Sequence, residues 1–236
     1  MSETTQLGLP LLQPAQAQKH VTVNEALVRL DGLTQLVLAS ATVTAPPVSA
    51  EDGTAYAVPA AATGNWAGHD NEIAIWSNGG WVFASPKVGW RGFIADVGLK
   101  AEFNGNGWVE SALAVSVNGA ASTFQVIEFD QVLSAGSSVS TAQVIPQYAT
   151  VFAVTGRVKT TITGAVTSFD IGVSGATNRY SSGIGLAAGS WFVGTTGQPQ
   201  AYYSDTPIEL TANGGDFAAG EVRLAIHYYL PTVPSV

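Results

Sequence analysis

The sequence predicts a mainly β protein: an N-terminal arm, one amphipathic helix, a small tryptophan-rich β-hairpin region, and a C-terminal antiparallel β-sandwich of jelly-roll type. Three observations support this fold class. The 236-residue chain contains 26 glycines and is only 11% charged, which is typical of closely packed strands joined by short glycine turns. Apolar residues follow a helical period in one segment near the N-terminus. Beyond residue 121, strand-like runs alternate with Gly or Pro turns.

The N-terminal segment from Leu7 to Val21 contains two prolines and Gly8 and follows neither period, so we expect an extended arm. Thr22 and Glu25 then fit a capping box, in which each side chain accepts a hydrogen bond from the other's backbone. Apolar residues at helical spacing predict a helix to about Ser40; they are Val23, Leu27, Leu30, Leu33 and Val37. Gly32 should weaken this helix by about 1 kcal/mol relative to Ala. The helix packs either on its own domain or in a symmetric bundle.

The segment 41–110 is predicted to be a set of short β-hairpins. Asn78-Gly79-Gly80 is a strong hairpin-turn signal between a strand at 73–76 and a strand at 81–84. This segment holds five of the six tryptophans, several of them directly after Gly or Asn: Trp66, Trp76, Trp81, Trp90 and Trp108. Core or interface packing is favoured for them over stacking on a ligand, because a tryptophan buries a large apolar area.

Residues 111–121 are small and weakly patterned, which indicates a linker. From residue 122 the spacing predicts a sandwich of six to nine strands, including Phe124–Phe129, Val151–Lys159, Ser168–Val173, Gln200–Tyr203, Ile208–Ala212 and Glu221–Tyr229. In the last run every second residue is apolar, so one face is expected to be buried: Val222, Leu224, Ile226 and Tyr228.

Residues 9–27 (LPLLQPAQAQKHVTVNEAL) resemble the N-terminus of an uncharacterised domain family found on tailed phages and gene transfer agents, including their head-spike proteins. With the tryptophan hairpins, the resemblance extends over residues 7 to about 110. The C-terminal part resembles the tip domain of gene-transfer-agent head spikes at Asp170–Val173, Tyr202–Pro207 and Asn213–Phe217.

This resemblance implies a particle protein in which residues 1–110 anchor and oligomerise, residues 111–121 link, and residues 122–236 bind a receptor. The implied function is adsorption to a bacterial cell through its capsular polysaccharide. The implied partners are that polysaccharide and a capsid or spike-base protein. Phage fibres are usually trimers, which favours a homotrimer, with a pentamer at a capsid vertex as the alternative. The protein would be assembled in the cytoplasm and released on the particle surface.

Composition argues against several other classes of protein. A net charge of −8, with nine scattered Lys and Arg residues, offers no track for a nucleic-acid backbone. There is no cysteine, and the three histidines lie in different regions, so neither a disulfide nor a zinc site is expected. The sequence shows no signal peptide and no apolar run long enough for a membrane span. No cofactor is expected.

A glycosidase would need two suitably placed carboxylates, and the C-terminal part offers Asp170, Asp205, Glu209, Asp216 and Glu221. Carboxylates in β-turns more often accept hydrogen bonds from backbone amides, which is the role expected for Asp205 and Asp216. A calcium site at residues 213–216 is disfavoured against a plain turn. The protein is therefore predicted not to be an enzyme. A polysaccharide-degrading spike and a purely structural capsid spike stay open as alternatives.

Rigid aromatic rings near hydrogen-bonding side chains suit the recognition of hydroxylated sugar rings. The predicted carbohydrate-binding residues are Asn178, Arg179, Tyr180, Trp191, Tyr202, Tyr203 and Asp205. Adjacent strand positions face opposite ways, so at least one of Tyr202 and Tyr203 is expected to be buried. Arg179 pairs either with an anionic sugar or with a local carboxylate. The hypothesis requires that aromatic rings such as Trp191 are open to water.

Overall fold

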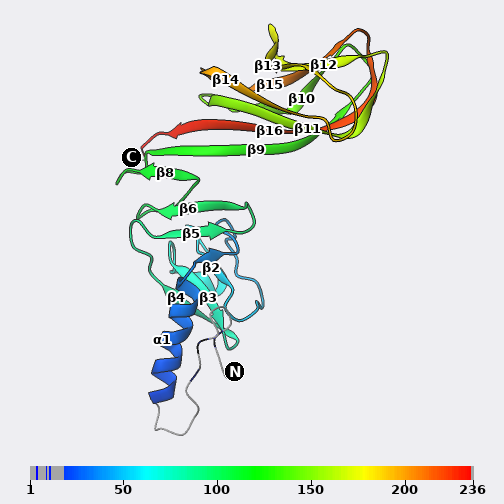
Figure 1. Cartoon of the computed structure of the whole chain (residues 1–236). Coiled ribbons are helices and arrows are strands. Elements are labelled where there is room, and N and C mark those ends of the chain that lie inside the picture. The colour runs from blue at the N-terminus through cyan, green and yellow to red at the C-terminus, as the bar shows by residue number, and fades with distance from the viewer. Residues whose placement is uncertain (1–3, 5–8, 10, 12–18, 235–236) are drawn as a thin grey trace. The chain divides into compact units, whose positions relative to one another are not determined.

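The computed structural model describes residues 4, 9, 11 and 19–234, and the chain forms two compact units (Figure 1). Unit 1 comprises Met1–Ala121 with Val233–Val236, and unit 2 comprises Ser122–Thr232. Strands dominate the described residues of both units, so the predicted mainly β fold class is confirmed. The segment predicted to be a linker contains strand β8 (Ala112–Val115). The predicted assignment of anchoring and receptor binding to the two parts of the chain stays a prediction.

Unit 1 is built on one mixed sheet with the strand order β4-β3-β2-β1-β5-β6-β7. The short central strand β1 is parallel to both β2 and β5, and the other neighbouring pairs are antiparallel. The elements of this unit are α1 (Lys19–Leu33), β1 (Val37–Leu38), β2 (Ala55–Ala57), the 3-10 helix η1 (Gly64–Trp66), β3 (Ile73–Ser77), β4 (Gly80–Ala84), β5 (Arg91–Ile94), β6 (Leu99–Phe103), β7 (Trp108–Glu110) and β8.

The helix differs from its prediction at both ends. It begins at Lys19, three residues before Thr22, so the predicted capping box is wrong. It ends at Leu33 rather than near Ser40, because Gln35 adopts a left-handed backbone conformation (φ 54°) and the chain then enters β1 in the middle of the sheet. Most of the predicted arm lies outside the described residues.

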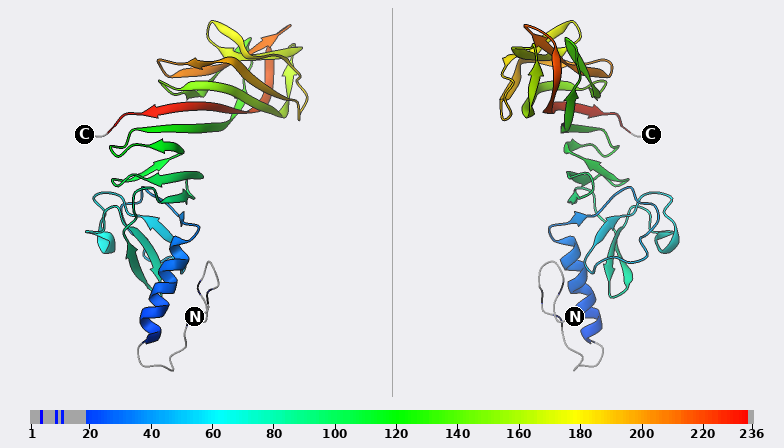
Figure 2. Two further views of the ribbon diagram at one scale, coloured as in Figure 1. Left: turned by 60° about the vertical axis from the view of Figure 1, so that its left-hand side comes forward. Right: turned by 90° about the vertical axis from the view of Figure 1, so that its right-hand side faces the viewer.

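The buried stripe of α1 also differs from the predicted one. Val23 and Leu30 are 41% and 52% exposed, whereas Asp31 and Gly32 are buried. Asp31 accepts a hydrogen bond from the Thr4 hydroxyl at 2.8 Å. A Cβ atom on Gly32 would lie 2.7 Å from Cδ1 of Ile75, so the glycine lets α1 approach β3 closely. Figure 2 shows α1 running along one flank of the unit 1 sheet.

The predicted hairpin at Asn78-Gly79 is confirmed. β3 and β4 are antiparallel neighbours with Trp76 opposite Trp81, and both Asn78 and Gly79 have the positive φ angles that a tight hairpin turn of this kind requires. The tryptophans of unit 1 pack as predicted. Trp66 is fully buried, 5.1 Å from the Trp81 ring, and Trp76, Trp81, Trp90 and Trp108 are half-buried.

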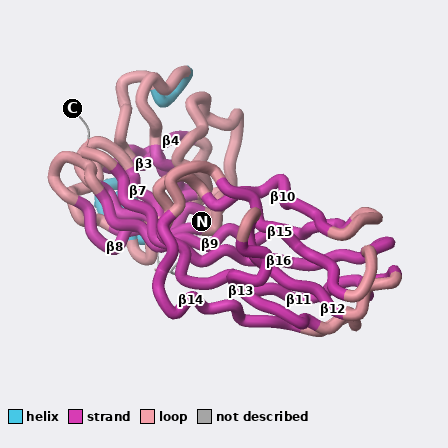
Figure 3. The backbone as a smooth tube through the Cα atoms, turned by 90° about the horizontal axis from the view of Figure 1, so that it is seen from above, coloured by secondary structure: helices cyan, strands magenta, loops and turns pink. Residues whose placement is uncertain are grey.

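Unit 2 is an eight-stranded jelly roll. Its strands are β9 (Ala121–Leu133), β10 (Ser138–Ile145), β11 (Thr150–Gly164), β12 (Ser168–Val173), β13 (Ala176–Ile184), β14 (Trp191–Ala201), β15 (Thr206–Asn213) and β16 (Phe217–Thr232). The first strand lies beside the eighth, the second beside the seventh, the third beside the sixth and the fourth beside the fifth. This nesting yields one sheet of order β10-β15-β12-β13 and one of order β14-β11-β16-β9. Figure 3 shows that strands, in magenta, make up most of the backbone of this unit.

The two sheets of unit 2 enclose a core of aliphatic and aromatic side chains. The predicted alternation in β16 is confirmed, since Val222, Leu224 and Ile226 are fully buried and Tyr228 nearly so. The sequence-based prediction missed β10 and β13 and placed a strand at 200–203, where β14 in fact ends. Both missed strands carry many Ser, Thr and Gly residues, so their sequences lack a strong apolar alternation.

Candidate functional site

The outward face of the sheet β14-β11-β16-β9 carries the strongest candidate site of unit 2. On three neighbouring strands the inward side chains are buried, including Val154 on β11, Phe192 on β14 and Leu224 on β16. Because successive strand residues point to opposite faces, the residues next to them point outward. These outward residues therefore line up across the sheet according to strand register.

Register places an aromatic ring and two guanidinium groups in one row. Arg157 on β11 is paired directly with Trp191 on β14 and with Arg223 on β16. The next outward row contains only smaller side chains, because Thr155 is paired with Val193 on one side and with Ala225 on the other. The step from long to short side chains leaves a hollow in the face.

This hollow, which we call the Trp191 groove, has a volume of about 510 Å³. It is lined by Glu128, Thr155, Gly156, Arg157, Trp191, Phe192, Val193, Arg223, Leu224 and Ala225, all within unit 2. Trp191 is 65% exposed, although tryptophan is normally among the residues that bury the most surface. The groove therefore combines an open aromatic ring with charged and hydroxyl groups.

The β9 side of the groove is held by a network of ion pairs. The Arg223 guanidinium donates hydrogen bonds to both carboxylate oxygens of Asp130, at 2.7 and 2.8 Å, and its Nε lies 3.9 Å from Glu128. Lys159 donates to Asp130 as well, at 2.7 Å. The hydrogen bonds from Arg223 and Lys159 hold the pKa of the Asp130 carboxyl well below its usual range. The Asp130 carboxylate and the Arg223 guanidinium therefore both stay charged near neutral pH.

Arg157 lies on the opposite side of Arg223 and is held differently. Its Nη1 donates to the backbone oxygen of Gly189 at 3.2 Å. Gly189 and Ser190 are themselves bonded to the backbone of Val158, which fixes the start of β14 beside Arg157. No ion pair to Arg157 is present among the described residues. The Arg157 guanidinium is thus held in place, but no carboxylate of the described residues neutralises its charge.

Two of the predicted carbohydrate-binding residues are core residues. Tyr180 and Tyr202 are only 5% and 9% exposed, and their hydroxyl oxygens are 2.6 Å apart. Burial raises the pKa of the Tyr180 hydroxyl. The prediction that these two rings contact a ligand is corrected: they pair with each other inside unit 2.

The other predicted residues are exposed. Trp191 lies in the groove, whereas Asn178 and Arg179 lie on β13, and Arg179 donates to the Gln200 side-chain oxygen at 2.9 Å. Tyr203 is 78% exposed. Asp205 accepts a hydrogen bond from the backbone N–H of Gln147 at 2.8 Å, which is the backbone-bonding role expected for it.

The structure does not bring Trp191 and Tyr203 together. Trp191 is the first residue of β14, and Tyr203 lies two residues beyond its last, so roughly 40 Å of extended chain separates them. Near Tyr203 lies Tyr148, also exposed, with a left-handed backbone (φ 67°) that is uncommon for such a residue. Backbone bonds from Tyr148 to Tyr202 and from Tyr202 to Ala149 hold this loop. The predicted site is thus two separate regions.

Sequence reasoning missed Arg157, Arg223, Thr155 and Val193. Alternation within a strand could have assigned each of them to an outward face. Their meeting depends on the pairing of β11 with both β14 and β16, which join segments far apart in the sequence. No local signal in the sequence reports that register.

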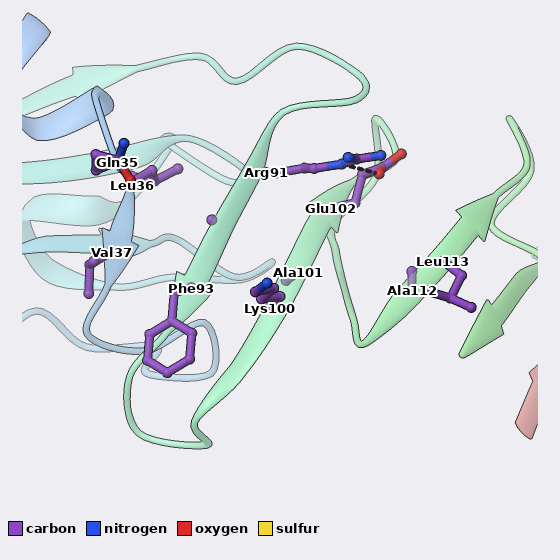
Figure 4. Close-up of a pocket in the computed structure, with 11 residues that line it drawn as sticks. Gln35, Leu36, Val37, Arg91, Phe93, Lys100, Ala101, Glu102, Ala112 and Leu113 are labelled. Atoms are coloured by element: carbon purple, nitrogen blue, oxygen red, sulfur yellow. Dashed lines mark hydrogen bonds and ion pairs between the residues drawn. The ribbon is translucent and has the colours of Figure 1, made fainter. Parts of the chain in front are cut away.

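Unit 1 contains a second hollow, of about 420 Å³, between the segment after α1 and strands β5, β6 and β8 (Figure 4). Its lining is mostly apolar, with Phe93 and Leu113 exposed at its surface. Its charged pair, Arg91 and Glu102, is closed on itself by a bond of 2.8 Å. Gln35 and Lys100 also line this hollow, so the Trp191 groove differs from it chiefly in its open tryptophan ring.

Two further features are absent from the described part of the chain. No group of His, Asp and Glu side chains there is placed to hold a metal ion. None of its helices has both the length and the apolar character needed to cross a bilayer.

Comparison with known proteins matches residues 23–109 to a family described as "Protein of unknown function (DUF2793)". This is the part of the chain in which the sequence resembles an uncharacterised phage-associated family. No curated protein matches the chain.

Among solved structures, the chain is similar to one from the cyanophage Pam1 capsid asymmetric unit (22% identity, TM-score 0.35, covering 50% of this chain and 93% of that one). It is also similar to a chain of the Bacillus endospore appendages, described as a novel family of disulfide-linked pili (19% identity, TM-score 0.24, covering 50% and 97%). Both TM-scores are too low to identify a shared fold.

Proposed function

We propose that the protein is a non-enzymatic spike or fibre component of a phage-like particle, of the gene-transfer-agent kind, and that unit 2 binds a bacterial capsular polysaccharide in the Trp191 groove. The observation that carries the binding proposal is the Trp191 ring, 65% exposed on a rigid strand at the edge of a groove with hydroxyl and guanidinium groups. Sites built on strands hold their side chains more firmly than sites on loops.

The groove has the two features that saccharide binding needs. An aromatic face provides apolar contact area against the C–H face of a sugar ring, while polar groups beside it fix the orientation of the hydroxyls. Arg157 offers such a group in the Trp191 row itself. In the next row Thr155 offers its hydroxyl, which also pairs with Nε2 of His227 at 3.1 Å. The volume of about 510 Å³ is enough for a few sugar residues rather than a long segment.

The particle location rests on the resemblance of residues 9–27 to a phage-associated family. A groove open on one face binds a sugar weakly, and a millimolar dissociation constant corresponds to about −4 kcal/mol. Many copies on one particle raise the overall affinity by roughly 10²–10⁴ without any new contact. We propose that unit 1 supplies the attachment to a capsid or spike-base protein and the contacts of a homotrimer or homopentamer.

The groove chemistry favours binding over cleavage. A glycosidase requires a carboxylic acid whose pKa is raised so that it can protonate the leaving group. It also requires a second carboxylate that flanks the same bond, whereas Glu128 is the one carboxylate among the residues that line the groove.

The test compares two exposed aromatic residues of the same unit in the full-length protein. We expect Trp191→Ala to weaken binding to a purified capsular polysaccharide by about tenfold, since stacking contributes roughly 1–1.5 kcal/mol. Tyr203→Ala, the matched control at the far end of β14, should change it less than twofold. A panel of capsular polysaccharides should be screened by surface plasmon resonance. Failure of every member to bind, or equal binding by Trp191→Ala and the wild type, would overturn the proposal.

A further inference from the structure

We infer that the polysaccharide bound in the Trp191 groove is acidic and that Arg157 receives its anionic group. This inference rests on the proposed function and adds the chemical class of the ligand. It is carried by the juxtaposition of an open aromatic ring with a positioned guanidinium that has no carboxylate partner among the described residues.

The charges that face the groove are distributed unevenly. Arg223 is engaged by Asp130 and approached by Glu128, and Lys159 is bonded to Asp130 and lies 3.2 Å from Glu221. These acidic groups all lie on the β9 and β16 side of the groove. Arg157, on the β14 side, makes one hydrogen bond to a neutral carbonyl and has further N–H donors to offer.

The pairing of Arg157 with Arg223 is the second observation. Like charges placed directly opposite each other on neighbouring strands destabilise a sheet. Arg223 is compensated by its own carboxylates, but the charge of Arg157 is not, so the middle of the outer face carries a local positive charge on a protein of net charge −8. A bound carboxylate or phosphate would remove this repulsion and match the planar fork of the guanidinium.

The same distribution sets the direction in which the sugar lies. Glu128 is exposed and lines the β9 side of the groove, where it would repel an anionic group. The anionic group of the ligand therefore lies beside Arg157 and Trp191. Neutral hydroxyls of the next sugar face Thr155 and Glu128, which can accept their hydrogen bonds.

Arg179 is the matched control for this inference. It also lies in unit 2, it is also exposed, and its described hydrogen bond is likewise to a neutral acceptor, the Gln200 side chain. It differs in place, because it lies on β13 and lines no part of the groove. Replacing either arginine by Gln removes one positive charge from the same unit, so only a local role of Arg157 distinguishes the two variants.

The experiment uses matched pairs of polymers with the full-length protein. The probes are alginate and hyaluronate, each native and with its carboxyl groups reduced to alcohols, and dextran with and without phosphate groups. Dissociation constants are measured for the wild type, Arg157→Gln, Arg157→Lys and Arg179→Gln. Circular dichroism confirms the fold of each variant, and light scattering gives its oligomeric state.

For the wild type we expect at least one anionic polymer to bind about tenfold more tightly than its neutral form, because charge-assisted hydrogen bonds exceed neutral ones. Arg157→Gln should lose this preference entirely, Arg157→Lys should keep part of it, and Arg179→Gln should keep all of it. The carboxylated and phosphorylated pairs distinguish the two sources of negative charge.

Several outcomes would contradict the inference. Equal binding of neutral and anionic forms would overturn it while leaving the proposed function in place, and so would a preference that survives in Arg157→Gln. Failure of all these polymers to bind would overturn the inference, and the proposed function would fall with it if the panel of capsular polysaccharides also failed to bind. A change in oligomeric state in Arg157→Gln would show that this face joins copies of the chain instead.

Discussion

The two units use tryptophan in opposite ways. In unit 1 the strands have two to five residues, and the tryptophans pack against the sheet and each other, with Trp66 fully buried. In unit 2 the strands have six to sixteen residues and enclose a largely aliphatic core, and its single tryptophan is 65% exposed. Unit 1 buries one aliphatic cluster around Leu38, Ile73 and Ile75 and a second, smaller cluster in which Trp66 is the largest side chain. A ring that the core does not need is available for a ligand.

The largest expected effect tests whether the buried Trp66 ring stabilises unit 1. Trp66→Ala should lower the free energy of unfolding of unit 1 by about 3–5 kcal/mol, since it removes a fully buried ring that contacts Tyr56 and Trp81. Trp191→Ala should change the stability of unit 2 by less than about 0.5 kcal/mol. Urea unfolding of Trp66→Ala is followed by tryptophan fluorescence, which reports mainly on unit 1 because five of the six tryptophans lie there. Urea unfolding of Trp191→Ala is followed by far-UV circular dichroism, because this variant has no tryptophan in unit 2.

A loss below about 1 kcal/mol in Trp66→Ala would contradict the idea that the buried Trp66 ring holds the second core cluster of unit 1 together. The urea transitions of the two units should be analysed separately, because a chain with two units need not unfold in one step.

A smaller effect is expected in unit 2, whose core contains a pair of tyrosines and no tryptophan. Tyr180→Phe leaves the buried Tyr202 hydroxyl without its partner and should lower the stability of unit 2 by about 1–2 kcal/mol. Tyr203→Phe, at an exposed position, is the control and should have no measurable effect.

The same pair predicts a pH dependence. Burial raises the pKa of Tyr180 in the folded state above its ordinary value of 10.0. Its contribution to stability is therefore complete below pH 10 and is lost as the pH rises further, because the unfolded chain then ionises first. Thermal unfolding between pH 8 and pH 12 should show this loss in the wild type and a weaker one in Tyr180→Phe. An identical pH profile for both proteins would contradict the assignment.

The smallest expected effect concerns the ion-pair network beside the groove. Because the pKa of Asp130 is lowered from its ordinary value of 3.8, its stabilising interaction is present above that value and is lost as the pH falls further. Exposed ion pairs contribute little, so the change in thermal midpoint between pH 6 and pH 3 should differ only slightly between the wild type and Asp130→Asn. A large difference would show that the network is a structural centre of unit 2.

Local sequence patterns predicted much of the fold. The hairpin at Asn78-Gly79 follows from turn chemistry, and the buried face of β16 follows from simple alternation. The helix was mispredicted because Val37 lies in a strand flanked by β2 and β5, and this tertiary pairing overrides the helical spacing. Strand β13 was missed because its residues 177–183 are almost all polar or small.

The candidate site was only partly predictable. Trp191 was among the predicted carbohydrate-binding residues, but its exposure follows from the structure alone; the rule of adjacent strand positions correctly required that Tyr202 or Tyr203 be buried. The row of Trp191, Arg157 and Arg223 could not be derived from the sequence. Trp191 and Arg223 lie 34 and 66 residues after Arg157, and the three meet only through strand register. A single sequence does not show which residues of distant strands are paired in a sheet.

The central claim is that Trp191, and none of the packed tryptophans, contacts the ligand. Fluorine NMR of the protein labelled with 5-fluorotryptophan tests it most directly, since the six tryptophans give six signals that single Trp→Phe variants assign. On addition of a polysaccharide that binds, we expect the Trp191 signal to shift while the five signals of unit 1 stay in place. A shift of a unit 1 signal with no change at Trp191 would contradict the account.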